Sequence, residues 1–224
     1  DEKKALYLHF TLDENPGLSD EIKARYKSMY AGIFYKRFIL GQWALADGVI
    51  YDMLDENENF YRPGEEPADM RWVSNRTIAC DYGTTNPCVF LDILDDGETI
   101  RIDREYRWDS RKEYRQKTDK EYADDLASFM GKNQCTVLVD PSAAFMVKAA
   151  NNNVLDGIRK TATLIQQRVI KISTECTGLH EELSSYMWDT KASQHGEEKP
   201  VKEMDHAPDA LRYYVNSLPS WRFE

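Results

Sequence analysis

The chain has 224 residues, of which 42% are hydrophobic and 30% charged, and its formal net charge is −10. This size fits one well-filled domain with an appendage or two small domains, and no apolar run is long enough to span a membrane. The excess of acidic residues by itself argues against a nucleic-acid-binding surface. However, an acidic metal site would add to the negative charge, and a local basic strip can lie on a protein whose net charge is negative.

The cysteines do not suggest a structural framework. They are widely scattered, without a C-x-x-C pair, at Cys80, Cys88, Cys135 and Cys176. This usage is typical of reduced, mostly buried thiols in a cytosolic protein, and it argues against disulfides or a structural zinc site.

The elements before residue 62 are predicted to be one strand and one long helix. Apolar and polar residues alternate over 6–12, which predicts a strand. Ser19 can cap a helix over about 20–40, in which apolar side chains recur at helical spacing. The polar segment over 62–72 contains Pro and Gly and predicts a boundary between two parts of the chain.

Beyond this boundary the pattern changes to that of a sheet. Three strands are expected, at 76–83, 87–94 and 98–108. The sequence Asp-Asp-Gly between the second and the third predicts a hairpin. A helix over 119–131 is expected, because Thr118 and Glu121 can form a capping box, and a short buried strand follows over 135–140.

The last third is predicted to be mainly helical. Helices are expected at about 154–167, 176–187 and 206–218, and the polar segment 188–200 is expected to be an exposed hairpin or loop. Taken in order, these elements predict an α/β fold. An antiparallel meander would lie beside a parallel crossover strand, with helices on both faces of the sheet.

Two of the predicted strands end in aspartate. Asp81 ends the first, and Asp140 ends the strand over 135–140. If these strands are parallel neighbours, the two residues lie about 5 Å apart. Carboxylates that close repel each other unless cations hold them, and hard oxygen ligands suit Mg²⁺ or Mn²⁺. On the last helix, His206 and Asp209 are three residues apart and project from one face.

Each of these residues also has a simpler interpretation. Asp81 alone is more readily a turn former, Asp140 before a proline is equally well a turn or cap residue, and Asp205 is favoured as the cap of the last helix. His206 alone is more readily a surface histidine. The combination is more specific, because three separate segments converge on one predicted sheet edge. Three carboxylates and an imidazole suit a two-metal phosphodiester hydrolase.

Four segments also carry a family resemblance. In chain order, "IACDYGTTNPCVF", "VLVDPSAA", "NNNVLDGIR" and "DHAPDALRYYV" resemble the nuclease domain of tailed-phage terminase large subunits, the motors that package and cut concatemeric viral genomes. The segment "LHFTLDENPGLSDEIKARYKSMYAGIFYKRFILGQWALADGVIY" is similar to the end of the motor ATPase domain and its helical connector. The resemblance therefore divides the chain into 1–61, which would be that connecting part, and 62–224, which would be the nuclease domain.

The resemblance implies a ribonuclease H-like fold of the resolvase-like branch, with a mixed central sheet flanked by helices. It implies an endonuclease that hydrolyses duplex viral DNA with two divalent ions, Mg²⁺ or Mn²⁺. The implied metal ligands and catalytic residues are Asp81, Asp140, Asp209 and His206. Lys199 and Lys202, just before the last helix, are expected to contact the DNA backbone.

The implied partners are double-stranded DNA and, in the full motor, the terminase small subunit and the portal protein. The isolated domain is expected to be a monomer without membrane contact, in the host cytoplasm at the procapsid. Two features depart from the family pattern. The sequence has no G-x-x-x-x-G-K-[ST] loop, and the stretch "PSAAFMVKAANNNV" is shorter than its family counterpart.

Two other functions fit parts of the sequence. The motif "DYGTTN" also resembles the first phosphate-binding loop of actin-like ATPases and sugar kinases, which share the same underlying sheet. Those proteins need a second Asp-x-Gly loop and a Gly-rich adenosine site, and this sequence has neither. The acidic composition also allows a non-catalytic module that docks a motor on a portal or capsid.

Overall fold

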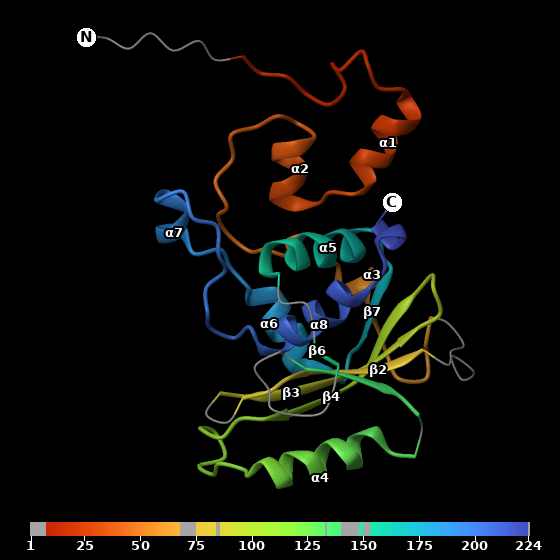
Figure 1. Cartoon of the computed structure of the whole chain (residues 1–224), viewed down its shortest axis with the longest axis vertical. Helices are drawn as coiled ribbons and strands as arrows, with labels where there is room; N and C mark the ends of the chain where they lie inside the picture. The colour runs from red at the N-terminus through yellow and green to blue at the C-terminus, as the bar shows by residue number, and fades with distance from the viewer. Residues whose placement is uncertain are drawn as a thin grey trace.

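A mixed β-sheet forms the centre of the protein (Figure 1). The computed structural model describes residues 8–67, 75–83, 86–132, 134–139 and 153–223, and the backbone of 148–149. Within these residues the sheet has seven strands, in the order β1-β7-β4-β3-β2-β5-β6. Their bounds are β1 Phe60–Tyr61, β2 Arg76–Asp81, β3 Cys88–Asp95, β4 Ile100–Trp108, β5 Thr136–Val139, β6 Lys148–Ala149 and β7 Ile170–Ser173.

The directions of the strands confirm the expected α/β architecture. Strand β3 pairs antiparallel with both β2 and β4, which makes the predicted meander. Strand β5 pairs parallel with β2 and places Val139 opposite Cys80. The next residue after Cys80 is Asp81, so the candidate carboxylate lies at the carboxyl end of a parallel pair.

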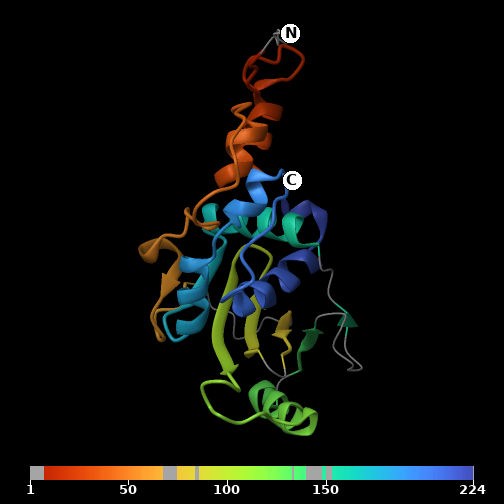
Figure 2. The same ribbon diagram turned by 90° about the vertical axis from the view of Figure 1, so that its left-hand side faces the viewer.

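Helices cover both faces of the sheet (Figures 1 and 2). Helix α4 (Asp119–Met130) lies on one face, whereas α5 (Val154–Gln166), α6 (Thr177–Ser185) and α8 (His206–Ser217) lie on the other. The remaining helices are α1 Asp20–Ser28, α2 Gly32–Phe38, α3 Glu56–Asn59, α7 Thr190–Gln194 and a 3₁₀ turn at Ser220–Phe223. Both halves of the capping box predicted for α4 are present, so that helix begins where its sequence indicated.

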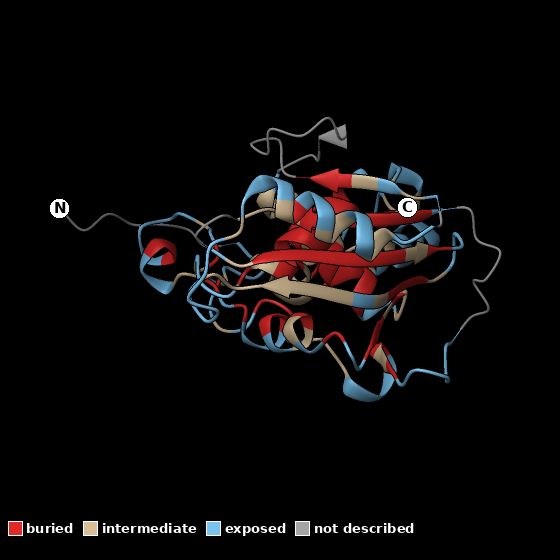
Figure 3. Ribbon diagram, turned by 90° about the horizontal axis from the view of Figure 1, so that it is seen from below, coloured by how far each residue is buried: buried red, intermediate tan, exposed pale blue. Residues whose placement is uncertain are grey.

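Strands β2 and β3 are buried from both sides, which explains their nearly continuous apolar sequences, and Figure 3 shows buried strands at the centre of the sheet. Alternate residues of β2 belong to two separate apolar clusters. Ile78 and Cys80 pack with Tyr122 of α4, whereas Ala79 packs in the larger cluster with Ile158 of α5 and Leu211 of α8. This two-sided packing fixes the position of the last residue of β2.

The expected strand over 6–12 is wrong for its described part. Residues 8–12 form no strand, and the side chains of Leu8 and Phe10 are exposed. Among the described residues no neighbouring strand pairs with this segment, and its backbone link to the rest is a bond from the Leu12 amide to the Ile39 carbonyl at 2.8 Å. An alternating sequence becomes a strand only where a sheet can take up its backbone groups.

The long helix expected over 20–40 is two helices. Ser19 caps the first as predicted, its hydroxyl accepting a bond from the amide of Ile22 at 3.3 Å. The chain then leaves the helical conformation, because Ala31 is extended and Gly32 has a positive φ of 53°. The break directs Phe34 into the core against Trp188, with ring centroids 6.3 Å apart.

Two other segments differ from expectation. The segment 188–200 was expected to be an exposed hairpin or loop. Its ends do pair antiparallel, Trp188 with Pro200, but α7 lies between them with Asp189 as its cap, and Trp188 is buried. Strand β7 was not predicted, although it pairs with both β1 and β4. The boundary expected over 62–72 falls partly outside the described residues, and the division of the chain at residue 62 stays a prediction. Within the described part of the chain, no helix could cross a membrane.

A buried ion cluster joins three strands to the end of α4. The carboxylate of Asp92 on β3 accepts bonds from Arg76 on β2 at 2.7 and 2.8 Å and from Arg104 on β4 at 2.5 Å. The two arginines also donate to the last carbonyls of α4, at Met130 and Phe129. Removing the buried charge of Asp92 would leave Arg76 buried without its counter-ion.

We therefore expect Asp92→Asn to lower the free energy of unfolding by about 3–5 kcal/mol, the usual cost of breaking a buried pair. For a chain of this length the melting temperature should fall by about 6–20 °C. Asp124→Asn is the matched control, because Asp124 forms an exposed pair with Lys120 on α4 and should cost less than about 0.5 kcal/mol. Chemical denaturation measures both, and a loss below about 1 kcal/mol for Asp92→Asn would contradict the prediction.

Candidate functional site

A cleft of about 980 Å³ opens at the carboxyl end of β2. Its walls come from the ends of β2 and β4, the loop after β4, the start of α6, and the segment that leads into α8. The cleft is strongly acidic, because Asp and Glu side chains outnumber Lys and Arg along it. It receives Asp81, His206, Asp209 and Lys202 from the predicted set of site residues.

Asp81 is held at the cleft from two directions. Its side chain is 16% exposed. One carboxylate oxygen lies 2.9 Å from Nδ1 of His206, and the other accepts a bond from the Tyr213 hydroxyl at 3.3 Å. The contacts join residues 125 and 132 positions apart in the sequence. The end of β2 and the start of α8 therefore meet at one carboxylate.

The N-terminal cap of helix α8 differs from the predicted one. Asp205 occupies the predicted cap position, but its side chain makes no capping bond and instead pairs with Lys202 at 3.1 Å. The carboxylate of Glu182 on α6 takes that role by accepting a bond from the amide of Ala207 at 2.7 Å. The N-terminus of α8 is thus fixed by a neighbouring helix and leaves His206 directed at Asp81.

Asp209 lies one turn further along α8 and is almost buried. It pairs with Arg212 at 3.0 Å and with Lys202 at 3.4 Å. The Arg212 side chain is only 1% exposed and passes directly over Gly157 of α5, where an added Cβ would overlap it. Gly157 therefore makes room for the arginine that orients Asp209.

The pKa values of Asp81 and His206 reflect the burial of both side chains. Burial raises the pKa of the Asp81 carboxyl, and the negative charge of Asp209 adds to the rise, while the hydrogen bond from His206 opposes it. Burial works to lower the pKa of His206, but the hydrogen bond to Asp81 and the nearby acidic charges outweigh it, so that pKa is raised. Because Asp81 responds to Asp209, the two carboxylates share one electrostatic environment.

Two other predicted residues differ in what the structure describes. Asp140 lies outside the described residues, one position after Val139, which pairs with Cys80, so its part in the site stays a prediction. Lys199 pairs with Glu197 at 2.9 Å and does not line the cleft. Lys202, by contrast, is a cleft residue bound to two carboxylates.

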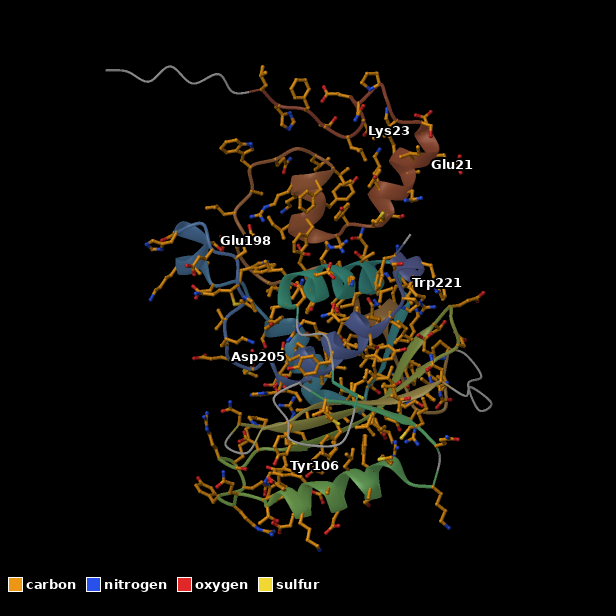
Figure 4. All side chains as sticks on the ribbon, in the orientation of Figure 1. Glu21, Lys23, Tyr106, Glu198, Asp205 and Trp221 are labelled. Atoms are coloured by element: carbon orange, nitrogen blue, oxygen red, sulfur yellow. The ribbon has the colours of Figure 1, made fainter. Side chains whose placement is uncertain are left out.

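A second charged cluster in the cleft was not predicted from the sequence. Arg107 on β4 pairs with Glu105 at 3.1 Å and with Glu182 at 2.7 Å, and Glu105 accepts a bond from the amide of Leu179. Tyr106, between Glu105 and Arg107, points to α4 and bonds Asp125 (Figure 4). The sequence did contain a signal for this cluster. Side chains alternate between the two faces of a strand, so residues 105 and 107 of β4 face the same side and residue 106 faces the other.

The donor chemistry of the cleft fits a hard divalent cation. Carboxylate oxygens with an imidazole are ligands that Mg²⁺ and Mn²⁺ accept, and the mutual repulsion of Asp81 and Asp209 would be relieved by positive charge. Within the described residues, no group of three His, Cys, Asp or Glu side chains is arranged to hold a metal ion. Asp140, a predicted ligand, is not among those residues.

Comparison with known proteins gives matches among solved structures, while no family model and no curated protein matches the chain. The large terminase of a thermophilic bacteriophage is 43% identical, with a TM-score of 0.84, over 95% of this chain and 55% of that one. The nuclease domain of the P22 large terminase has a TM-score of 0.59 at 18% identity, covering 77% of this chain and 93% of that domain. The large terminase nuclease of a second thermophilic phage, G20c, solved with bound magnesium, has a TM-score of 0.57 at 13% identity, over 78% of this chain and 98% of that one.

The two nuclease domains establish the fold, which confirms the expected ribonuclease H-like α/β architecture. The chain spans about half the length of the 43% identical terminase. Since 95% of it aligns with that protein, the chain belongs to the phage large terminase family.

Proposed function

We propose that the chain is a divalent-metal-dependent endonuclease that cuts concatemeric duplex DNA during viral genome packaging. The observation that carries the proposal is the meeting of Asp81 with His206 and Asp209 in one acidic cleft. Kinship with large terminases and the fold of their nuclease domains support the same function.

The residues that would hold two ions, Mg²⁺ or Mn²⁺, are Asp81, Asp209, His206 and Asp140. Bound ions would supply Lewis-acid stabilisation of the negative charge that develops on a phosphate under attack. The G20c nuclease, which shares the fold, was solved with bound magnesium and also with bound cobalt. In this chain the mutual repulsion of the carboxylates is the physical reason to expect cation binding.

The other cleft residues would position this set. Tyr213 and His206 fix the two oxygens of Asp81, so that its carboxylate cannot rotate freely. Arg212 holds one oxygen of Asp209 from the buried side, which leaves the other, now bonded to Lys202, at the cleft. Of the two lysines predicted to contact the DNA backbone, Lys202 lines the cleft, where it pairs with Asp205 and Asp209, whereas Lys199 does not line it.

The biological setting is part of the proposal, because the chain spans only about half of its 43% identical relative. In a complete motor we expect the nuclease to work with a terminase small subunit and a portal protein, at the procapsid in the host cytoplasm. We expect the region before residue 62 to connect it to the motor ATPase.

Cleavage of plasmid DNA in Mn²⁺ or Mg²⁺ tests the role of Asp81. We expect Asp81→Asn to reduce the cleavage rate by about 100-fold or more, because it removes a negative ligand and keeps the shape of the side chain. Asp124→Asn on the outer face of α4 is the control and should cut like the wild type. Equal cleavage by wild type and Asp81→Asn would sink the proposed function.

Metal binding can be measured without any reaction. At a Mn²⁺ concentration about ten times the dissociation constant, binding to the folded state adds about 1.4 kcal/mol of stability. For a protein of this size the melting temperature should then rise by about 3–5 °C. The rise should vanish with EDTA and shrink in Asp81→Asn.

An identical Mn²⁺ shift in Asp81→Asn would place the cation elsewhere. A shift produced by ATP, in a chain that never cuts DNA, would instead favour the actin-like or sugar-kinase alternative. No shift and no cleavage would favour the docking-module alternative.

A further inference from the structure

The loop between β4 and α4 carries a concentration of basic residues on an otherwise acidic protein. It runs from Asp109 to Lys117 with the sequence "DSRKEYRQK". Arg111 and Lys112 in this loop are exposed, and they line the same cleft as Asp81 and His206. Figure 1 shows the loop leading into α4 on one side of the sheet, whereas α6 and α8 lie on the other.

The other cleft cations are already paired. Arg107 is held by Glu105 and Glu182. Lys202 is held by Asp205 and Asp209. Their charges are therefore largely compensated within the protein.

Arg111 and Lys112 differ in this respect, because neither forms an ion pair with any residue that the structure describes. The guanidinium of Arg111 donates to the neutral side-chain amide of Asn86 at 3.1 Å. This bond orients the guanidinium and leaves its charge uncompensated. In a cleft lined mainly by carboxylates, these two side chains are the positive charge left over for an anionic partner.

The loop is held in place by its own contacts. The amide of Glu113 donates to the Asp109 carbonyl at 2.9 Å, and the Trp108 indole donates to the Arg115 carbonyl at 3.2 Å. The ammonium of Lys117 lies 3.8 Å from the centroid of a Trp108 ring and pairs with Asp125 at 2.5 Å. A loop anchored at both ends presents Arg111 and Lys112 without a large ordering cost on binding.

We propose that Arg111 and Lys112 bind the phosphate backbone of duplex DNA and hold it in the cleft for cleavage. This inference rests on the proposed nuclease function. A guanidinium and an ammonium suit phosphate oxygens, and contacts of this kind position DNA without reading its sequence. The loop thereby offsets the repulsion that a chain of net charge −10 exerts on DNA.

A charge-matched pair of double variants tests the proposal. Arg111→Gln/Lys112→Gln removes the cleft charges, and Arg115→Gln/Lys120→Gln removes two nearby charges that lie outside the cleft and pair with Glu121 and Asp124. Both are made in the full chain carrying Asp81→Asn, so that binding is measured without cutting. The probe is a fluorescent duplex of about 30 base pairs, titrated by anisotropy over a range of salt concentrations.

The cleft pair should weaken binding by about 10-fold at about 100 mM salt and lower the slope of log K against log salt by about two, one for each lost phosphate contact. The control pair should change the affinity less than about twofold. With Asp81 restored, the cleft pair should raise KM and leave the saturated cleavage rate near that of the wild type. The melting temperatures of the two double variants should agree with that of their parent chain. If Arg111→Gln/Lys112→Gln lowers the melting temperature, the single variant Lys112→Gln replaces it in the binding test.

The inference would be overturned if both double variants lost DNA affinity equally, or if Arg111→Gln/Lys112→Gln lost none. Either result would count even if the wild type cuts DNA. A wild type that binds DNA through Arg111 and Lys112 but never cuts it would remove the proposed function and leave the phosphate contacts standing. The two failures are therefore distinguishable.

Discussion

The contact between Asp81 and His206 is the interaction on which the site depends. It joins the last residue of β2 to the first residue of α8 across 125 positions of sequence. Its geometry is set by packing on both partners, since β2 is buried between two apolar clusters and residues 207–216 of α8 are all buried. A site built on a central strand and a buried helix is held more firmly than one built on loops.

The charges around this contact show how the protein keeps several carboxylates close together. Asp209 is balanced by Arg212 from the core side and by Lys202 from the cleft. Glu105 and Glu182 are balanced by Arg107, and Glu182 also caps α8. Within the part of the chain that the structure describes, Asp81 is bonded by an imidazole and a tyrosine hydroxyl and by no lysine or arginine, so a bound cation would add the positive charge that its neighbours Asp209, Glu105 and Glu182 receive from basic side chains.

Much of this architecture could be predicted from local sequence. The capping box at Thr118 and Glu121, the Asp-Asp-Gly hairpin, and the apolar strands at 76–83 and 87–94 are short-range signals, and the structure follows them. The position of Asp205 before α8 was predicted as well. Its predicted capping bond is wrong, because the capping carboxylate comes from Glu182 on another helix. No local pattern reports such a contact.

The other differences have the same origin. The alternation over 6–12 has no strand to pair with in its described part, residues 8–12, and the break at Gly32 brings Phe34 against Trp188, a contact between segments far apart in the sequence. Strand β7 is only four residues long and follows closely on α5. Four residues are too few for the alternation of a strand to be recognised in the sequence. The pairing of Arg107 with Glu105 and Glu182 likewise depends on how α6 packs on β4. Gly178 of α6 leaves room there for the side chains of Glu105 and Arg107.

Asp81 and the first turn of α8 are proposed to hold the divalent cation used for DNA cleavage. Anomalous diffraction from crystals soaked in Mn²⁺ locates such a cation. We expect a peak in the cleft at about 2.0–2.2 Å from carboxylate oxygens of Asp81 and Asp209. Crystals of a chain that cuts DNA in Mn²⁺, but whose anomalous peaks all lie away from these two residues, would contradict the account.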